Sequence, residues 1–354
     1  MRGRNLYSLP KLLIGGKDIT EFKNVAVSFP GNNQINTLTV SIEDPEYQDA
    51  HLFNSKVEFY LGEGVSEGSP IFVGYVKEIN PSDTSISIVA YDPRIFISGN
   101  EAEPIAITDK SNYDGYTAVQ FLASVIKDKI NTTSTIIDLS GLSDFSPETP
   151  MKGYRTNGLS PYEIFLEVMA KTVDSTNPED PLEYYITMEE NRLIVGKKKS
   201  VEDDSRSMIL SYMDGIKSLS YTHRAPATTA VGVGTGELGG YGSFTYGNAP
   251  MGKVGMTFQS EKTDNAEIYE EALLTVMKNY NEQKEISVDA SRGFYIGLES
   301  LVYLSVPDKN IRGNHRVTSK RIQVSGSDIT CTLGLDKRKP RLGDYLERKI
   351  TLGG

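Results

Sequence analysis

The chain has 354 residues, enough for two or three domains that each bury a core. Its formal net charge of −10 argues against a nucleic-acid-binding surface, which needs clustered Lys and Arg to displace counterions. The single cysteine, Cys331, excludes disulfides within the chain and a cysteine-based metal cluster.

No apolar run reaches the roughly 20 residues that span a bilayer, so no membrane anchor is expected. The first residues, MRGRNLYSLPKLLIGG, begin like an export signal, but Lys11 and the glycines interrupt the apolar stretch. Folding in a cytoplasm is therefore expected. Tyr and Phe are plentiful, which suits the half-buried faces of β-sheets.

Residues 1–100 predict a first small β-barrel, with a sandwich as the other natural closure. Short segments alternate apolar and polar residues, and a period of two places one set of side chains on one face of a strand. Turn signals separate the segments, and Gly15-Gly16 is a hairpin signal because glycine accepts the positive φ of a tight turn. The alternating apolar positions are Val25, Val27 and Phe29, then Leu38, Val40 and Ile42, then Val57, Phe59 and Leu61, then Ile86, Ile88 and Ala90.

Residues 101–215 predict an α+β insert of two helices and a hairpin. A capping box at 117–120 precedes apolar residues at helical spacing. A second helix is expected after Ser160-Pro161-Tyr162-Glu163, which supplies an N-cap serine, a proline at the first helical position and an acid at the third. The hairpin should turn near Glu190-Asn191.

Residues 216–336 predict a second β-barrel, and 337–354 form a basic C-terminal tail. A glycine-rich loop at 232–252 and a helix at 264–282 are expected to interrupt the second barrel. The fold class is therefore mainly β (α+β), with two similar small barrels and a helical and hairpin insert between them.

The two β-rich blocks resemble each other in sequence, which indicates an internal repeat. Residues 72–92 can be laid over 315–336 with Ile79 placed against Ile322, and the apolar pairs that follow need no gap. Residues 56–62 then match 300–305 within one position. The aligned apolar pairs are Ile79 with Ile322, Ile86 with Ile329, Ile88 with Cys331, and Ala90 with Leu333.

The sequence contains no motif that supports a catalytic function. Gly234–Gly239 fits G-x-G-x-x-G, but GYGSFTYGNAPMG follows where a dinucleotide site needs a helix. The three histidines lie in separate segments without metal-ligand spacing, and Cys331 is expected in the core. We expect no enzymatic activity, no cofactor and no metal, although carboxylates assembled across a fold are invisible to this reasoning.

Two segments are candidates for partner contacts. The glycine-rich loop carries aromatic side chains that could order against a partner and supply rigid contact area. The tail could meet an acidic surface, or be merely solvated. The candidate residues are Tyr241, Phe244, Tyr246, Arg338, Lys339 and Arg341.

Several segments together resemble the baseplate hub family of phage tails, which includes the late control protein D group and the related secretion-system spike hubs. They are KLLIGGKDIT, KVEFYLGEG with PIFVGYVKEI, SISIVAYD and NHRVTSKRIQVSGSDITCTLGLD. The resemblance implies a virion structural protein of the tail baseplate. It implies a homotrimer whose six barrels match a sixfold tail tube while the ring keeps threefold symmetry for a spike.

The same resemblance implies a tail tube or distal tail protein on one side and a spike or fibre protein on the other. DNA would pass through during ejection without specific binding, because an acidic wall repels phosphates. Three other interpretations stay open. They are a hub-like tail-associated protein of a non-contractile tail, a stand-alone ligand-binding β-barrel, and a carbohydrate-active β protein, although the last would need an export signal and a tryptophan-lined cleft.

Overall fold

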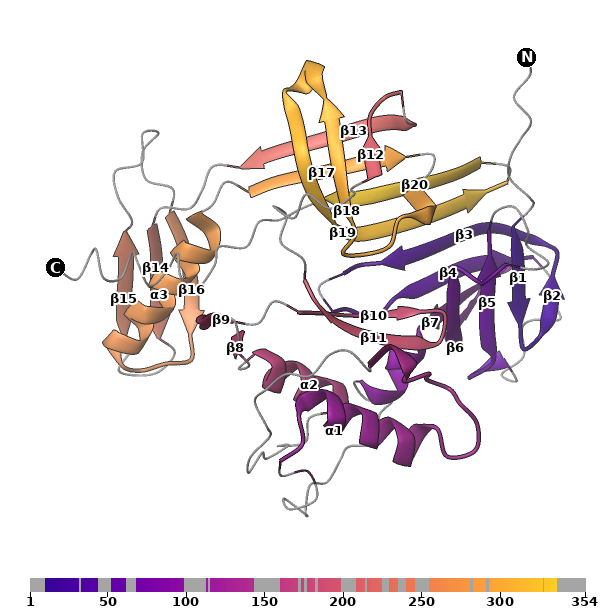
Figure 1. Ribbon diagram of the computed structural model, residues 1–354, viewed down its shortest axis with the longest axis horizontal. Helices are drawn as coiled ribbons and strands as arrows, with labels where there is room; N and C mark the ends of the chain where they lie inside the picture. The colour runs from indigo at the N-terminus through magenta and orange to yellow at the C-terminus, as the bar shows by residue number, and fades with distance from the viewer. Residues whose placement is uncertain are drawn as a thin grey trace. The chain divides into compact units, whose positions relative to one another are not determined.

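The chain is mainly β with a few short helices in the computed structural model (Figure 1). The structure describes residues 10–31, 33–43, 52–61, 68–98, 113, 115–142, 160–170, 173–174, 177–181, 184–198, 208–213, 215–224, 229–234, 240–245, 255–280, 283–290, 293–326 and 328–335. The chain forms two units. Unit 1 is Met1–Ser218 with Val288–Gly334, and unit 2 is Leu219–Ser287 with Leu335–Gly354.

Seven antiparallel strands near the N-terminus make up the first strand set. They pair in the order β3-β4-β7-β6-β5-β1-β2. Gly15 and Gly16 have φ values of 59° and 80°, which confirms the predicted two-glycine turn. The bounds are β1 (Lys11–Ile14), β2 (Lys17–Ile19), β3 (Phe22–Phe29), β4 (Thr37–Ile42), β5 (Lys56–Tyr60), β6 (Phe72–Pro81) and β7 (Ile86–Tyr91).

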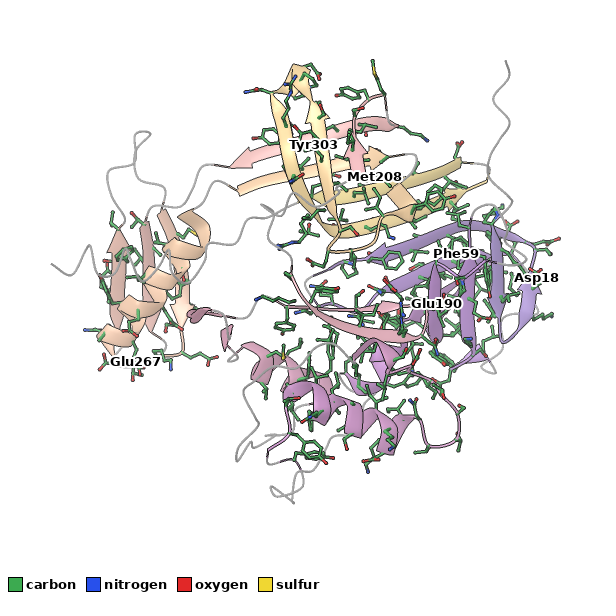
Figure 2. The ribbon with its side chains drawn as sticks, in the orientation of Figure 1. Asp18, Phe59, Glu190, Met208, Glu267 and Tyr303 are labelled. Atoms are coloured by element: carbon green, nitrogen blue, oxygen red, sulfur yellow. The ribbon has the colours of Figure 1, made fainter. Side chains whose placement is uncertain are left out.

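The alternating pattern of the first strand set is realised as one buried face. All the apolar positions predicted for it are buried except Leu61, which is half-buried. In Figure 2 Phe59 lies inside this set, and Asp18 lies on β2 at its outer edge. Short strands with charged residues are a common way to protect a sheet edge from pairing with other chains.

A second strand set has the same strand order as the first. Its strands pair in the order β13-β17-β20-β19-β18-β12, which matches β3-β4-β7-β6-β5-β1 strand for strand. One difference is that β12 runs parallel to β18, whereas β1 runs antiparallel to β5. The bounds are β12 (Met208–Leu210), β13 (Ile216–Arg224), β17 (Gln283–Ala290), β18 (Leu301–Val306), β19 (Ile311–Ser325) and β20 (Asp328–Leu335).

Side-chain hydrogen bonds within unit 1 follow this strand order. The Ser218 hydroxyl of β13 donates to one carboxylate oxygen of Asp289 in β17, at 2.5 Å. The Thr332 hydroxyl of β20 donates to the other, at 2.6 Å. Asp289 therefore links its two neighbouring strands on one face of the sheet.

The turns before β5 and β18 share an uncommon backbone geometry. Asn54 and Glu299 are both left-handed, with φ of 63° and 61°. Each of the two turns then exchanges a pair of backbone hydrogen bonds with the long strand that follows. The N–H groups of Asn54, Val76, Glu299 and Val317 donate to the carbonyls of Val76, Ser55, Val317 and Ser300 respectively. Since few non-glycine residues adopt this conformation, its recurrence at matching places supports the internal repeat.

The two sets are joined side by side, and closure of either set into a barrel is not detected. The second half of β19 pairs antiparallel with β3, from Lys320 opposite Phe29 to Ser325 opposite Asn24. Among the described strands, the path from β13 to β2 is open, with no pairing between its end strands. The mainly β class is confirmed, whereas two separate closed barrels are not observed.

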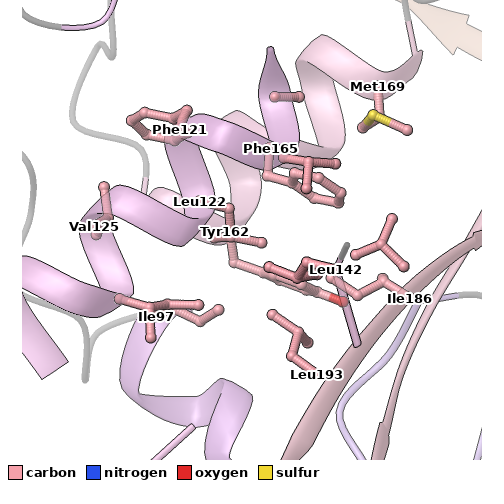
Figure 3. Packing of buried hydrophobic residues seen from close by; sticks show 14 of the residues in the cluster. Ile97, Phe121, Leu122, Val125, Leu142, Tyr162, Phe165, Met169, Ile186 and Leu193 are labelled. Carbon is pink, nitrogen blue, oxygen red and sulfur yellow. The ribbon is translucent and has the colours of Figure 1, made fainter. Parts of the chain in front are cut away.

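The insert between the two sets packs around its own apolar core (Figure 3). The predicted capping box forms between Thr117 and Gln120, and the predicted N-cap Ser160 exchanges hydrogen bonds with Glu163. The hairpin turns at Glu190, as expected, with Glu189 paired to Arg192. The elements are η3 (Pro93–Ile97), α1 (Ala118–Val125), the π-helical turn η5 (Ile126–Ile130), η6 (Ser140–Leu142), α2 (Pro161–Ala170), β8 (Val173–Asp174), β9 (Asn177–Pro181), β10 (Tyr184–Glu189) and β11 (Arg192–Lys197).

Unit 2 contains a three-stranded sheet in the order β15-β14-β16, with α3 packed on β14 and β15. Its elements are β14 (Thr229–Gly234), β15 (Tyr241–Thr245), β16 (Gly255–Ser260) and α3 (Asn265–Tyr280). The helix lies within the range predicted for it. Two strands occupy part of the segment 232–252, which was predicted to be a loop. Two short 3-10 turns of unit 1 complete the described elements of the chain, η7 (Gly293–Tyr295) and η8 (Pro307–Lys309).

The glycines of this segment have a packing role that the loop interpretation missed. A Cβ atom on Gly242 would lie 2.4 Å from the backbone nitrogen of Tyr269 in α3. Cβ atoms on Gly232 and Gly240 would lie 2.7 Å and 2.5 Å from side-chain carbons of Ile268. Glycine is thus needed where the helix lies directly on the sheet backbone.

Gly242→Ala is expected to destabilise unit 2 by about 1–3 kcal/mol, because the added methyl group must displace backbone atoms of α3. Amide hydrogen exchange of β14 and β15 measures this as lost protection. The control is Gly255→Ala, where nothing lies within 4 Å of the added Cβ. Equal effects of the two substitutions would contradict close packing of α3 on Gly242.

Candidate functional site

The residues predicted to contact partners have different environments in the structure. Tyr241 is 58% exposed on β15, which suits a contact residue. Phe244 is only 7% exposed and packs in the core of unit 2 with Ala230, Ala272 and Val276. Its role as a surface contact is therefore corrected to a core role, since alternation along β15 turns it toward α3. Tyr246, Arg338, Lys339 and Arg341 lie outside the described residues.

The described residues carry no constellation typical of catalysis or metal binding. Within them, no group of three or more His, Cys, Asp or Glu side chains could hold a metal ion. Cys331 is 3% exposed, and burial raises the pKa of its thiol to about 11. The neutral thiol is a poor nucleophile, as expected for a core residue. None of the helices described here has the length and apolar character needed to cross a membrane.

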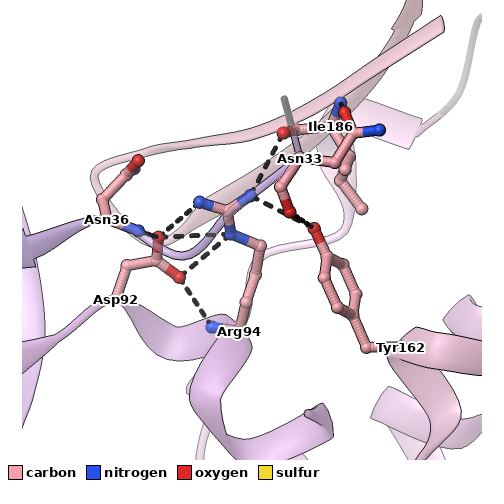
Figure 4. A network of polar contacts seen from close by, with 6 residues as sticks. All are labelled: Asn33, Asn36, Asp92, Arg94, Tyr162 and Ile186. Carbon is pink, nitrogen blue, oxygen red and sulfur yellow. Dashed lines mark hydrogen bonds and ion pairs between the residues drawn. The ribbon is translucent and has the colours of Figure 1, made fainter. Parts of the chain in front are cut away.

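A buried polar cluster, the Arg94 network, attaches the insert to the first strand set (Figure 4). Asp92 caps η3, and Arg94, two residues later in the first turn, is fully buried. The Arg94 guanidinium donates to both carboxylate oxygens of Asp92, with the shortest contact at 2.6 Å. Its Nη1 also donates to the carbonyl of Ile186 in β10 at 3.1 Å. Bidentate pairing of this kind is among the strongest geometries for a buried ion pair.

Asn33 and Tyr162 extend the network to the β3–β4 connection and to α2. The Tyr162 hydroxyl donates to the Asn33 carbonyl, and the Ile186 N–H donates to the Asn33 side-chain oxygen at 3.1 Å. Asn33 has a φ of 64°, and both of its acceptors bond to residues of the insert. The N–H of Asn36 donates to Asp92 at 2.7 Å. The network therefore joins four chain segments that are far apart in sequence.

Burial shifts the proton equilibria of this network. Burial is the largest single effect on the pKa of Arg94 and lowers it, but the interactions with Asp92 and Tyr162 together outweigh burial, and the net pKa is raised. The pKa of Tyr162 is raised to about 12, first by burial, while the nearby Arg94 charge opposes the rise. Arg94 is thus charged and Tyr162 neutral at physiological pH.

A smaller charge cluster attaches the insert to the second strand set. Glu299 lies 3.5 Å from the ammonium of Lys198, which follows β11. It also lies 3.5 Å from the guanidinium of Arg316 in β19. All three side chains are at most 15% exposed. The insert is therefore held to both strand sets by polar contacts.

One face of the sheet forms a groove of about 380 Å³ over the junction of the two sets. It runs over β3, β4, β7 and the end of β19, and its lining is mostly small and uncharged. Asn24, Ala26, Thr39, Ser41 and Ser87 line it, and Asp328 adds one carboxylate. The groove has neither a nucleophile–base pair nor a cluster of cations.

Solved structures show which known proteins share this fold. No family model matches the sequence, and no curated protein is significantly similar to it. The 43 kDa tail protein of prophage MuSo2 from Shewanella oneidensis aligns with 12% identity and a TM-score of 0.61, over 93% of this chain and 96% of that one.

Two further structures agree. A tail protein from Neisseria meningitidis MC58 aligns with 12% identity and a TM-score of 0.61, over 96% of this chain and 99% of that one. An E. coli component of the type VI secretion system, described as structurally similar to the T4 phage tail proteins gp27 and gp5, aligns with 9% identity and a TM-score of 0.56, over 94% and 80%. The expected resemblance to tail hubs is confirmed at the level of the fold.

Proposed function

We propose that this chain is a structural protein of a phage tail, the baseplate hub of the late control protein D-like group that is related to secretion-system spike hubs. The observation that carries the proposal is the repeated strand order, β3-β4-β7-β6-β5-β1 and β13-β17-β20-β19-β18-β12. The shared fold with two tail proteins, over more than 90% of both chains, supports it. The chain would act by assembly, without catalysis or a cofactor.

The repeat suits a change of symmetry. Three chains with two strand sets each would present six similar surfaces to a sixfold tail tube. The ring of chains would keep threefold symmetry for a spike. We propose that each strand set acts as one small barrel in this ring. Neighbouring barrels would then meet through surfaces that complement each other, as a closed ring requires.

The proposed parts follow the sequence boundaries: barrels at 1–100 and 216–336, the insert at 101–215 and a tail at 337–354. A tail tube or distal tail protein would lie on one side of the ring, and a spike or fibre protein on the other. DNA would pass through without specific binding, since a chain with a net charge of −10 repels phosphates. The protein would be made in the host cytoplasm and reside in the tail baseplate of the virion.

The test is the mass of the purified protein by light scattering, with negative-stain images of the same sample. We expect three times the chain mass of 39.0 kDa and ring-shaped particles. A chain that stays monomeric at high concentration would contradict the hub and favour a stand-alone barrel.

A further inference from the structure

The contact between the two strand sets is a strand pairing with a buried apolar side. Residues 320–325 of β19 pair antiparallel with 24–29 of β3, so that Ile322 lies opposite Val27. Both of these side chains are 0% exposed, and Phe29 beside them is 7% exposed. Each set thus contributes one surface to this contact: β3 from the first and the end of β19 from the second.

Because the strand sets repeat, each of these two surfaces occurs a second time in the chain. The counterpart of β3 is β13, the outermost strand of the second set. The counterpart of the end of β19 is the end of β6, since Ile79 corresponds to Ile322 in the repeat. Among the described strands, β13 pairs only with β17, and residues 78–81 pair only with β7.

The second pair of surfaces is more exposed than the first at matching positions. Ile79 is half-buried, whereas Ile322, in the strand paired with β3, is 0% exposed. On β13, Ser218 faces Asp289, so alternation turns Leu219 and Tyr221 to the face that Val27 and Phe29 occupy in β3. Leu219 is half-buried and Tyr221 is 41% exposed. The residues of the second pair of surfaces are therefore more exposed than those of the β3–β19 contact. The reason is that this kind of contact is made only once within the chain.

We propose that β13 of one copy of this chain pairs antiparallel with the Glu78–Pro81 end of β6 in a second copy, repeating the β3–β19 contact between chains. This inference rests on the proposed hub and names the surfaces that build its ring. The two surfaces differ, so the contact is head-to-tail, and such contacts form a ring when the rotation closes. Three chains then make the same kind of contact six times, alternately within and between chains.

Proline at position 81 makes the contact between chains weaker than its counterpart. The Ser82 N–H donates to Ser85 within the hairpin, so the neighbouring position 81 is directed to the open edge. Val324 has this place in β19, opposite Val25. Proline has no N–H to donate, so the contact between chains lacks one backbone hydrogen bond.

Disulfide trapping in the full chain tests the pairing. The β3–β19 register places Gln323 opposite Ala26, and the matching positions are Asn80 and Ser218. Asn80→Cys and Ser218→Cys are introduced into one chain, and mild oxidation should yield covalent dimers and trimers on a non-reducing gel. Asn80→Cys with Ser220→Cys covers a register shifted by two residues. Buried Cys331 contributes little background.

Two control variants separate this contact from other edges. Asn80→Cys with Thr39→Cys places the second thiol on β4, an interior strand, and should give only monomers. Asp18→Cys with Ser218→Cys reports pairing through the β2 edge instead. Trapping only through Asp18, or no trapping in a sample with trimer mass, would overturn the pairing and leave the hub intact. A strict monomer would overturn both.

A surface variant provides a second measurement. Tyr221→Asp should raise the concentration at which the assembly dissociates, on the order of tenfold or more, because it places a charge in the proposed contact. Tyr303→Asp, at a tyrosine of β18 that is 38% exposed, is the matched control and should leave that concentration unchanged. Equal dissociation of the two variants would contradict the proposed surface.

Discussion

Replacing Asp92 with asparagine is expected to lower the free energy of unfolding of unit 1 by about 3–5 kcal/mol. The substitution removes the carboxylate that neutralises Arg94, whose guanidinium is 0% exposed and too far inside to recover water. It also weakens the acceptor of the Asn36 N–H. Urea unfolding followed by tyrosine fluorescence measures the change.

An exposed ion pair of the same unit is the control. Glu189 and Arg192 lie 2.6 Å apart at the tip of the β10–β11 hairpin, with side chains 61% and 47% exposed. Arg192→Ala should cost no more than about 1 kcal/mol, because water replaces the lost contact. If Asp92→Asn is as mild as Arg192→Ala, the Arg94 network does not hold the insert in place.

Phe244→Ala is expected to destabilise unit 2 by about 3–5 kcal/mol, the range for removing a buried phenyl ring. The ring is 7% exposed and meets the ring of Tyr269 edge to face, with centroids 5.8 Å apart. Because the core of this unit is small, one lost ring is a large fraction of it. Amide exchange across β14, β15 and α3 should show the loss.

Tyr241→Ala is the matched control three residues away on β15. Its side chain is 58% exposed, so we expect a change within about 0.5 kcal/mol. Similar losses for both substitutions would mean that Tyr241 also has a core role. Loss of assembly with intact stability would instead support Tyr241 as a partner contact.

Local sequence patterns predicted the strands and helix starts well. The alternation in β3, β4, β5 and β7 became buried faces, since a strand must turn alternate side chains to opposite sides. The capping box at Thr117 and the N-cap bonds at Ser160 formed because they join residues three apart and need no tertiary partner. The repeat was also visible, from Ile79 and Ile322 onward.

The candidate contact residues were predicted less well. Aromatic residues among glycines indicated a loop, and that inference placed Phe244 on the surface. In the structure the glycines lie beneath α3, and Ile268 occupies the space that side chains at Gly232 and Gly240 would need. Glycines in a sequence indicate positions without side chains. Both a tight turn and a sheet surface under a closely packed helix require such positions, so the glycines alone do not distinguish the two. The helix predicted at 264–282, which follows the glycines, could have indicated that they pack beneath a helix.

The sequence by itself determined the mainly β class, most strands of the two strand sets and the duplication, because these depend on short periodic patterns. Only the tertiary structure decided how the two strand sets meet, through β3 and β19, and that the described strands form an open path. It alone also brought Asn33, Arg94 and Tyr162 together across the first strand set and the insert. Contacts between distant residues depend on how whole sheets and helices pack, and no local spacing in the chain encodes them.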